Sequence, residues 1–374
     1  RKAHVQTVMI TGDHVDTALA IAKELGIAQS HEQCMRGEEL DALSEEELIE
    51  RVEGIRVFAR VSPEHKVRIV HALKAKGKTV AMTGDGINDA PSLRAADVGV
   101  AMGKGGTDVA RNAADLILTD DNFSTIEKAI REGRGIYENI RKTILFLLSS
   151  NFGEIITMLV AILAGFPATL KASHILWVNL ITDSLPALAL GMDGNDGEEL
   201  MKQPPRKSTD TMFSHGGLSC TLCYGVVIGV ISILAFMAVP YEELLQRQLP
   251  VNLLSMKKIL EIEWILNKAQ THAFTVLGMS QLVHAVGMRD VNRSVFRMKH
   301  FENLYMLAAL GIGLLLQVLV TEVPYLITLF ETNRLTLSEW GRLQILSLTP
   351  LAVHELLCLF TAAGQKQVRA EEVH

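Results

Sequence analysis

The 374-residue chain has few of the residues that build stapled, fibrous or disordered proteins. It contains 4 Cys, 10 Pro and 28 Gly, and 48% of its residues are hydrophobic. This composition excludes a disulfide framework, a collagen-like fold and intrinsic disorder. The formal net charge is only −6, which gives no electrostatic reason to expect nucleic acid as a partner. The sequence begins at Arg1 with neither an initiator Met nor an apolar signal peptide, so we expect the C-terminal part of a longer polypeptide.

Charged residues are concentrated in the first part of the chain. Residues 1–140 hold 41 of the 78 charged side chains, and residues 141–374 hold the other 37. The second part contains six stretches long enough to cross about 30 Å of hydrocarbon. They are approximately 143–165, 173–192, 218–240, 269–288, 304–321 and 343–365. Six such runs argue against the alternative of buried helices in a soluble protein, so the sequence predicts a multi-pass integral membrane protein, with lipid around a bundle of six helices.

The flanks of these stretches predict an orientation. One side carries 13 Lys and Arg residues and the other carries 7. Because positive charge favours the cytoplasmic side, we expect residues 1–125, a helical connector at 126–142 and a tail at 366–374 to be cytoplasmic. Cys220 and Cys223 form a CxxC at the start of the third stretch, where small buried apolar residues are expected rather than a metal or redox pair.

Two of the stretches carry polar side chains on one helical face. Asn151 and Glu154 are three residues apart in the first, and Asn179, Thr182 and Asp183 share a face in the second. All five offer oxygen, the ligand atom that calcium prefers. The alternative is a cluster of inter-helix hydrogen bonds around a protonated Glu154.

Two other residues of these stretches complete the membrane predictions. Pro186 has no amide proton for the Thr182 carbonyl, which predicts a free oxygen or a local unwinding there. Glu355, beside His354, is expected to be part of a buried pair that ties the bundle together.

The first part alternates short β-branched runs with amphipathic helices. Strands are predicted at 7–10, 58–60, 79–85, 98–102 and 115–119, and helices near 14–25, 63–76 and 88–96, with another that starts near Ser124. This order predicts an α/β domain with a mostly parallel sheet and functional groups at the carboxyl ends of its strands. The acidic segment 35–52 is expected to be a helical insertion at the surface.

The strand ends carry a phosphate-handling pattern. MITGD ends the first strand with Thr11, Gly12 and Asp13, where a hydroxyl and backbone amides can hold a phosphate. Lys66 opens a later helix and can neutralise phosphate charge. MTGDGINDAP places Asp85 and Asp89 four residues apart at another strand end, which suits Mg²⁺ beside a transferring phosphoryl group.

These motifs resemble the C-terminal part of a P-type ATPase. The resemblance rests on TGDH, FARVSPEHK, MTGDGINDAPSLRAADVGVAMG and LTDDNFSTI, followed by the six stretches. SSNFGE and LWVNLITDSLPALALG are similar to calcium pumps of the sarco/endoplasmic-reticulum type and their bacterial relatives. The resemblance covers nearly the whole chain. It implies part of a haloacid-dehalogenase-like (Rossmann-like) phosphorylation domain followed by a six-helix transmembrane bundle in a bacterial cell membrane, and an ATP-driven exporter of calcium that works through an aspartyl-phosphate intermediate.

The resemblance also assigns roles. Asp85 would coordinate Mg²⁺, Asn88 and Asp89 would support the phosphate and the metal geometry, and Thr11, Gly12 and Lys66 would contact the phosphoryl group. Asp13 and Arg60 would face ATP. The calcium ligands would be Asn151, Glu154, Asn179, Thr182 and Asp183.

Two departures from the family pattern matter. The DKTGT motif with its nucleophilic Asp is absent from these 374 residues, so this segment without the rest of its polypeptide is expected neither to hydrolyse ATP nor to pump. Gln281 stands where two-calcium pumps have a Glu, which predicts a weak second site because a neutral amide binds calcium less strongly. Alternatives are a pump for manganese or a monovalent cation, a non-catalytic membrane partner, and a soluble phosphatase that would leave the six stretches unexplained.

Overall fold

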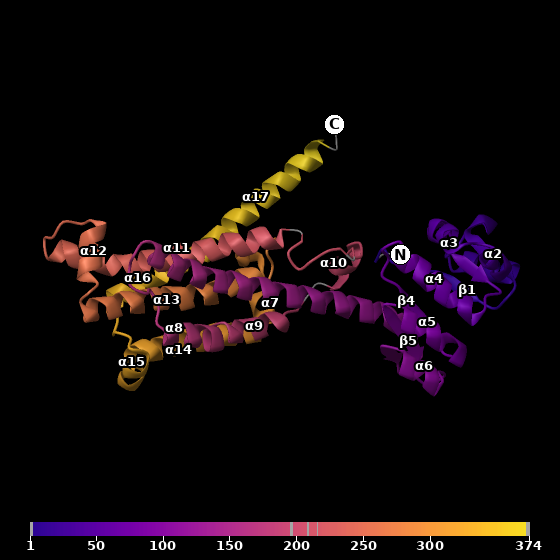
Figure 1. Ribbon diagram of the computed structural model, residues 1–374, viewed down its shortest axis with the longest axis horizontal. Helices are drawn as coiled ribbons and strands as arrows, with labels where there is room; N and C mark the ends of the chain where they lie inside the picture. The colour runs from indigo at the N-terminus through magenta and orange to yellow at the C-terminus, as the bar shows by residue number, and fades with distance from the viewer. Residues whose placement is uncertain (1–2, 195–196, 208, 215, 372–374) are drawn as a thin grey trace. The chain divides into compact units, whose positions relative to one another are not determined.

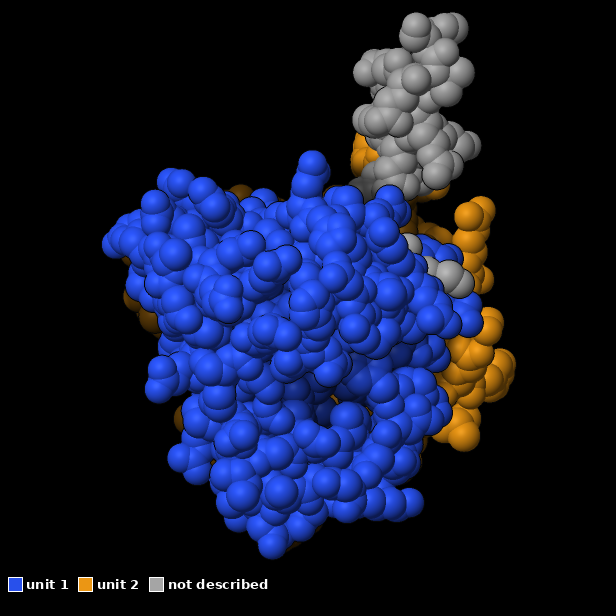
Figure 2. All heavy atoms as spheres, turned by 90° about the vertical axis from the view of Figure 1, so that its right-hand side faces the viewer, with its two compact units in different colours: residues 1–135, 196–210 blue, residues 136–195, 211–374 orange. Residues whose placement is uncertain are grey.

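The computed structural model describes residues 3–194, 197–207, 209–214 and 216–371. The chain forms two compact units, which Figure 2 distinguishes by colour. Unit 1 comprises residues 1–135 and 196–210, and unit 2 comprises 136–195 and 211–374. Figure 1 labels the helices and strands and colours them by their order along the chain.

Unit 1 begins with a three-stranded parallel sheet in the order β1-β3-β2. The strands are β1 (Met9–Thr11), β2 (Cys34–Arg36) and β3 (Val57–Ala59). The helices that accompany them are α1 (Val15–Glu24), α2 (Gly37–Asp41), α3 (Glu45–Arg51) and α4 (Pro63–Ala75). Parallel strands joined by helices are buried on both faces, which explains why β3 is wholly buried.

A second parallel sheet has the order β4-β5-β6. Its strands are β4 (Ala81–Gly84), β5 (Val98–Met102) and β6 (Leu116–Leu118), with helices α5 (Ala90–Ala95) and α6 (Asp108–Ala113) between them. Ile10 of the first sheet packs against the core of the second, which contains Val70, Met82 and Leu93. The predicted α/β class with parallel strands is confirmed, but the strands form two small sheets instead of one.

The segment 35–52 differs from its prediction. It does contain the helices α2 and α3, but it opens with β2, which pairs with β3 as an internal part of the fold. Leu40 and Leu48 are fully buried in the same core as Phe58. The sequence did not reveal these buried positions, because only one residue per helical turn faces inward on such short helices and the others are mostly acidic.

The remainder of unit 1 comes from two later segments. The first turns of α7 (Ser124–Leu163) belong to it, together with α10 (Gly197–Lys202). Arg134 joins them: its guanidinium donates to the carbonyls of Leu200 at 2.9 Å, Gln203 at 3.0 Å and Ala3 at 2.9 Å.

Unit 2 is entirely helical in the part that the structure describes. Besides the rest of α7 it contains α8 (Ala172–Trp177), α9 (Ser184–Gly191), α11 (Gly217–Gln246), α12 (Leu253–Ile259), α13 (Glu263–Met288), α14 (Leu304–Glu322), α15 (Pro324–Phe330), α16 (Leu337–Ser347) and α17 (Thr349–Glu371). α13 packs extensively on α11 and also contacts α14, α16 and α17.

Four helical segments of the described chain are long and apolar enough to cross a membrane. They are Ser124–Leu163, Gly217–Gln246, Leu304–Glu322 and Leu337–Phe360. The predicted second and fourth stretches are helical but fall outside this set, so the number of six spans stays a prediction. The predicted connector 126–142 is the first part of one unbroken helix, α7. Part of the predicted tail, 372–374, lies outside the described residues, and 366–371 continue α17.

The second predicted stretch is not a regular helix. Between α8 and α9 the chain makes a π-helical turn, η4 (Val178–Thr182), in which the Asp183 amide donates to the Val178 carbonyl at 2.9 Å. A π-turn inserts an extra residue into the helix and often marks a functional position. The local distortion predicted from Pro186 is therefore present at the polar face.

Candidate functional site

The loop after β4 brings three of the predicted phosphate-site residues together. Lys66, from α4, lies with its Nζ 2.5 Å from Oδ1 of Asp89. The other oxygen of Asp89 accepts the amide protons of Asp85 at 3.2 Å and Gly86 at 3.1 Å. Burial raises the pKa of Asp89, but the bonds from Lys66, Gly86 and Asp85 outweigh it and hold the pKa below its usual range.

Gly84 and Thr107 shape this loop. A Cβ at Gly84 would lie 2.4 Å from the Cβ of Asp89, so no larger residue fits at the end of β4. Thr107 donates its amide to the Asp85 carbonyl at 2.8 Å and its hydroxyl at 3.2 Å. The sequence motifs did not point to Thr107; its position as the N-cap of α6 is the only signal for it.

Asp85 and Asn88 are exposed beside this loop. Among the described residues, the Asp85 carboxylate accepts no hydrogen bond and forms no ion pair, whereas that of Asp89 is fully engaged. The donor set thus fits one hard cation held by a single carboxylate with water and phosphate oxygens, the arrangement that Mg²⁺ favours.

A second group forms at the end of β1. The Thr11 hydroxyl donates to Asp13 Oδ2 at 3.0 Å, and the Arg60 amide donates to the Asp13 carbonyl at 3.2 Å. Arg60, at φ 52°, lines a pocket of about 280 Å³ with His14, Val15, Arg36, Gly37 and Glu38. Gly12 is exposed between Thr11 and Asp13. No hydrogen bond or ion pair of the described residues links this group to the Lys66–Asp89 pair.

The polar face of unit 2 centres on Glu154, which is buried. Its Oε2 accepts a hydrogen bond from Asn179 Nδ2 at 3.0 Å, and its Oε1 accepts one from Gln281 Nε2 at 3.3 Å. Three predicted ligands from α7, η4 and α13 therefore meet directly. Asn151 does not join them by a hydrogen bond, because its amide nitrogen donates to the Leu147 carbonyl of its own helix at 2.9 Å.

The carboxyl group of Asp183, on the same polar face, is buried without a polar partner in the part of the chain that the structure describes. Its residue is 0% exposed, and among the described residues neither carboxylate oxygen has a hydrogen-bond partner. The buried Thr182 precedes it in the π-turn. A buried charge without a partner is very costly, so two carboxylates here require either protons or a cation.

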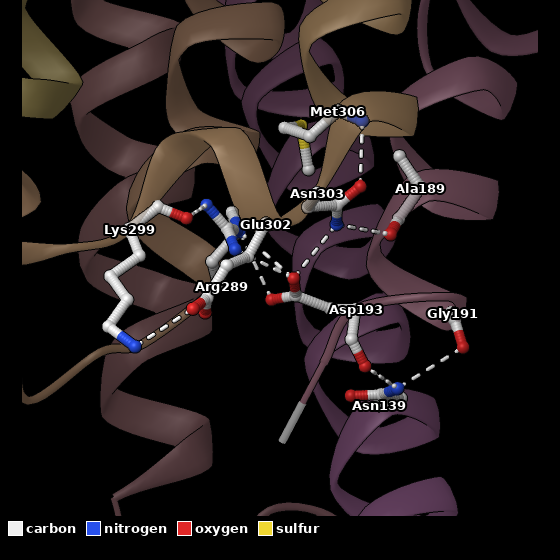
Figure 3. A network of polar contacts seen from close by, with 9 residues as sticks. All are labelled: Asn139, Ala189, Gly191, Asp193, Arg289, Lys299, Glu302, Asn303 and Met306. Carbon is white, nitrogen blue, oxygen red and sulfur yellow. Dashed lines mark hydrogen bonds and ion pairs between the residues drawn. The ribbon is translucent and has the colours of Figure 1, made fainter. Parts of the chain in front are cut away.

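The opposite end of α9 is fixed by a network shown in Figure 3. Arg289 at the end of α13 forms a buried ion pair with Asp193 at 2.8 Å. Asn303 donates to Asp193 Oδ1 at 2.8 Å and to the Ala189 carbonyl at 2.9 Å, and Asn139 of α7 donates to the Asp193 carbonyl at 2.8 Å. The sequence analysis missed this network, which joins residues more than fifty positions apart.

The predicted His354–Glu355 pair is wrong. His354 Nε2 is 3.0 Å from the Arg293 carbonyl, and its Nδ1 is 3.1 Å from the Tyr224 hydroxyl. Glu355 instead accepts the amide proton of Val295 at 2.7 Å. Successive residues of a helix point in different directions, so the two side chains tie the bundle together through separate partners. Cys220 and Cys223 are free and partly exposed instead of buried.

The fold and the two polar sites define a class of protein. A parallel α/β domain with an acidic loop precedes a helical bundle that has membrane-capable helices and buried carboxylates, as in a membrane protein coupled to a phosphate-handling domain.

Comparisons with known proteins give the family. Residues 167–360 match the family described as cation transporting ATPase, C-terminus, and residues 1–97 and 67–130 match haloacid dehalogenase-like hydrolases. The chain belongs to the cation-transporting ATPase family.

Similar proteins include three calcium-transporting ATPases. Calcium-transporting ATPase 1 of Bacillus cereus is 52% identical over 361 residues, which are 96% of this chain and 40% of that protein. The calcium-transporting ATPase of Bacillus subtilis is 47% identical over 91% of this chain and 36% of its own length. Calcium-transporting ATPase 1 of Saccharomyces cerevisiae is 36% identical over 96% of this chain and 36% of its own length. The chain thus spans about two fifths of the length of these relatives.

Proposed function

We propose that this chain is the C-terminal part of an ATP-driven P-type pump that exports calcium from the cytoplasm through an aspartyl-phosphate intermediate. The unit 2 site would hold the transported ion, and unit 1 would handle the phosphoryl group. Moving a divalent ion outward against 100 mV costs ~4.6 kcal/mol before any concentration gradient, so the transport needs an energy source such as phosphoryl transfer.

The observation that carries this proposal is the unpartnered carboxylate of Asp183. Its two oxygens are buried without a donor among the described residues, and the second carboxylate, Glu154, is held by two neutral amides. No Lys or Arg of the described residues pairs with either carboxylate. A buried, oxygen-rich cluster with two carboxyl groups of this kind suits calcium, which accepts 6–8 oxygen ligands in flexible geometry.

In unit 1, Asp85 would hold Mg²⁺, and this ion would neutralise and orient phosphate oxygens when bound. Lys66 would place its ammonium against the phosphoryl group while Asp89 fixes its position. Thr11 and Gly12 would contact the same group, with Asn88 supporting it. Arg60 would face ATP, because the pocket that it lines also contains the second guanidinium of Arg36. Asp13, whose carbonyl accepts the Arg60 amide proton, would stand beside it.

The nucleophilic Asp and the remaining ligands would come from the rest of the polypeptide. A pump for manganese or a monovalent cation is the alternative of the same class. A non-catalytic membrane partner is the alternative of another class, and the DKTGT motif upstream in the parent gene distinguishes it from a pump.

The test is equilibrium calcium binding to the full-length enzyme and to Asp183→Asn. We expect one tightly bound calcium in the unmodified enzyme and loss of tight binding in the variant, because an uncompensated carboxylate becomes a neutral amide. Gln281→Glu should strengthen a second site by adding a charged ligand. Unchanged affinity in Asp183→Asn would overturn the site, and two tight calcium ions in the unmodified enzyme would overturn the stoichiometry.

A further inference from the structure

Gln317 of α14 is a buried side chain that the sequence analysis did not single out. It is 1% exposed, and its Nε2 donates to the Thr275 hydroxyl of α13 at 3.4 Å. Among the described residues its Oε1 has no hydrogen-bond partner. Leaving a buried acceptor without a donor is unfavourable, which favours a role for this oxygen that the chain alone does not fulfil.

The oxygen of Gln317 lies beside the ion site. A Cβ placed on Gly278 of α13 would be 3.3 Å from Gln317 Oε1 and 3.7 Å from Cγ2 of Thr182. Gly278 is three residues before Gln281 and three after Thr275, so it neighbours each of them on the surface of α13. The Gln317 oxygen and Thr182 of the π-turn therefore flank the same glycine, one helical turn from the amide that binds Glu154.

The two glutamines follow one pattern. The amide nitrogen of Gln281 donates to Glu154, and Gln281 Oε1 has no partner among the described residues. Gln317 likewise has its nitrogen engaged and its oxygen unpartnered. With Asp183, three separate elements each bring buried, unpartnered oxygen to one region of unit 2.

We propose that Gln317 supplies a further neutral oxygen to the transported cation and favours calcium over smaller divalent ions. This inference rests on the proposed ion site. An added neutral ligand raises the coordination number without adding charge, and calcium accepts 6–8 oxygens where Mg²⁺ requires near-octahedral geometry. A larger set of oxygen ligands thus favours calcium through the number and spacing of the ligands, and Gln317 supplies one of them.

The experiment measures calcium binding to the full-length enzyme at equilibrium, with competition by Mn²⁺, for Gln317→Leu. Leucine keeps the side-chain volume and removes the oxygen. We expect the calcium Kd to rise about tenfold, equivalent to one lost ligand interaction, and the Mn²⁺ Kd to change by less than about threefold. The preference for calcium should fall accordingly.

Thr321→Val is the matched control. Thr321 is on the same helix, is equally buried, and its hydroxyl already donates to the carbonyls of Gln317 and Val318 at 3.1 Å. We expect its calcium Kd to stay unchanged. Gly278→Ala is an independent variant, because its methyl group approaches the same oxygen from α13 without altering Gln317; we expect the same loss of preference.

Thermal unfolding with and without calcium separates ligation from packing. If Gln317 only joins α13 to α14, Gln317→Leu lowers the unfolding temperature without calcium and leaves the calcium-induced rise and the Kd ratio intact, which overturns the inference. Unaltered or tighter calcium binding in Gln317→Leu also overturns it, while loss of binding in Asp183→Asn would leave the proposed function standing. If neither variant alters binding, the proposed function fails as well. Should Gln317→Leu not fold, Gln317→Asn, which withdraws the oxygen by one methylene, and Gly278→Ala carry the test.

Discussion

Replacing Lys66 by Met tests whether its ion pair with Asp89 holds the loop after β4. The variant keeps the aliphatic stem but leaves Asp89, whose side chain is 11% exposed, without its cation. Breaking a buried ion pair costs ~3–5 kcal/mol; because the Lys66 side chain is 21% exposed, we expect a smaller local loss of about 2–3 kcal/mol. The loss should appear where Asp89 binds the backbone, at the amides of Asp85 and Gly86.

The same pair predicts a pH dependence. The folded-state pKa of Asp89 is lowered, so its stabilising contribution is complete above the ordinary carboxyl pKa of ~3.9 and is lost as the pH falls through the lowered value. In Lys66→Met the hydrogen bond and the positive charge that lower the Asp89 pKa are removed, while the burial that raises it remains. The contribution of Asp89 should therefore begin to disappear at a higher pH than in the unmodified protein.

Hydrogen exchange at the amides of Asp85 and Gly86, followed as a function of pH, measures the local opening free energy. Lys74→Met is the matched control, because Lys74 pairs with Asp97 at 3.0 Å and both side chains are about one-third exposed. A pair this exposed contributes about 0–1 kcal/mol. Equal destabilisation in the two variants, or unaltered exchange of the Asp85 and Gly86 amides in Lys66→Met, would refute the reasoning.

Two further predictions concern unit 2. Gly229→Ala should destabilise the bundle by about 1–3 kcal/mol and weaken calcium binding, because a Cβ there would lie 2.6 Å from Ile156 Cγ2, in the seam that contains Gly153 beside Glu154. Gly311→Ala, in open space on α14, is the control in thermal unfolding, and equal effects would contradict the packing argument. A Gly-Ser insertion at Tyr137 would interrupt the unbroken helix α7. The full-length enzyme with this insertion should still be phosphorylated by inorganic phosphate, but calcium should no longer inhibit that reaction, whereas an insertion at Leu249 should leave the inhibition intact. Retained inhibition in the Tyr137 insertion would exclude α7 as the coupling element.

The sequence predicted the parallel α/β domain well because its motifs sit at strand ends. The strand at 98–102 has the predicted bounds, and the one predicted at 58–60 is shifted by a single residue. β2 was missed because three residues next to an acidic segment carry no periodic signal; only its pairing with β3 makes it a strand. The division into two sheets depends on such pairings and is not encoded in local patterns.

The proposed ion site was predictable to the extent that charge marks it. Glu154 and Asp183 stand out in apolar stretches, and Asn179, which the spacing singled out, donates to Glu154. Gln317 carries no charge and stands alone on its helix, so only the contacts between helices bring it beside Thr182. The same holds for Asp193 and Arg289, whose importance lies in a long-range contact.

The two ends of α9 differ in how their backbone is held. At its far end, Asn139 ties the carbonyl of Asp193 to α7, the helix that also carries Glu154. At the near end, the π-turn releases the regular hydrogen-bond pattern just before Asp183. The hydrogen bond of Asn139 therefore links α7 and α9 at one end, while the hydrogen-bond pattern next to Asp183 is that of a π-turn. A cation that draws Asp183 towards Glu154 would then change the π-turn and leave the Asp193 anchor in place.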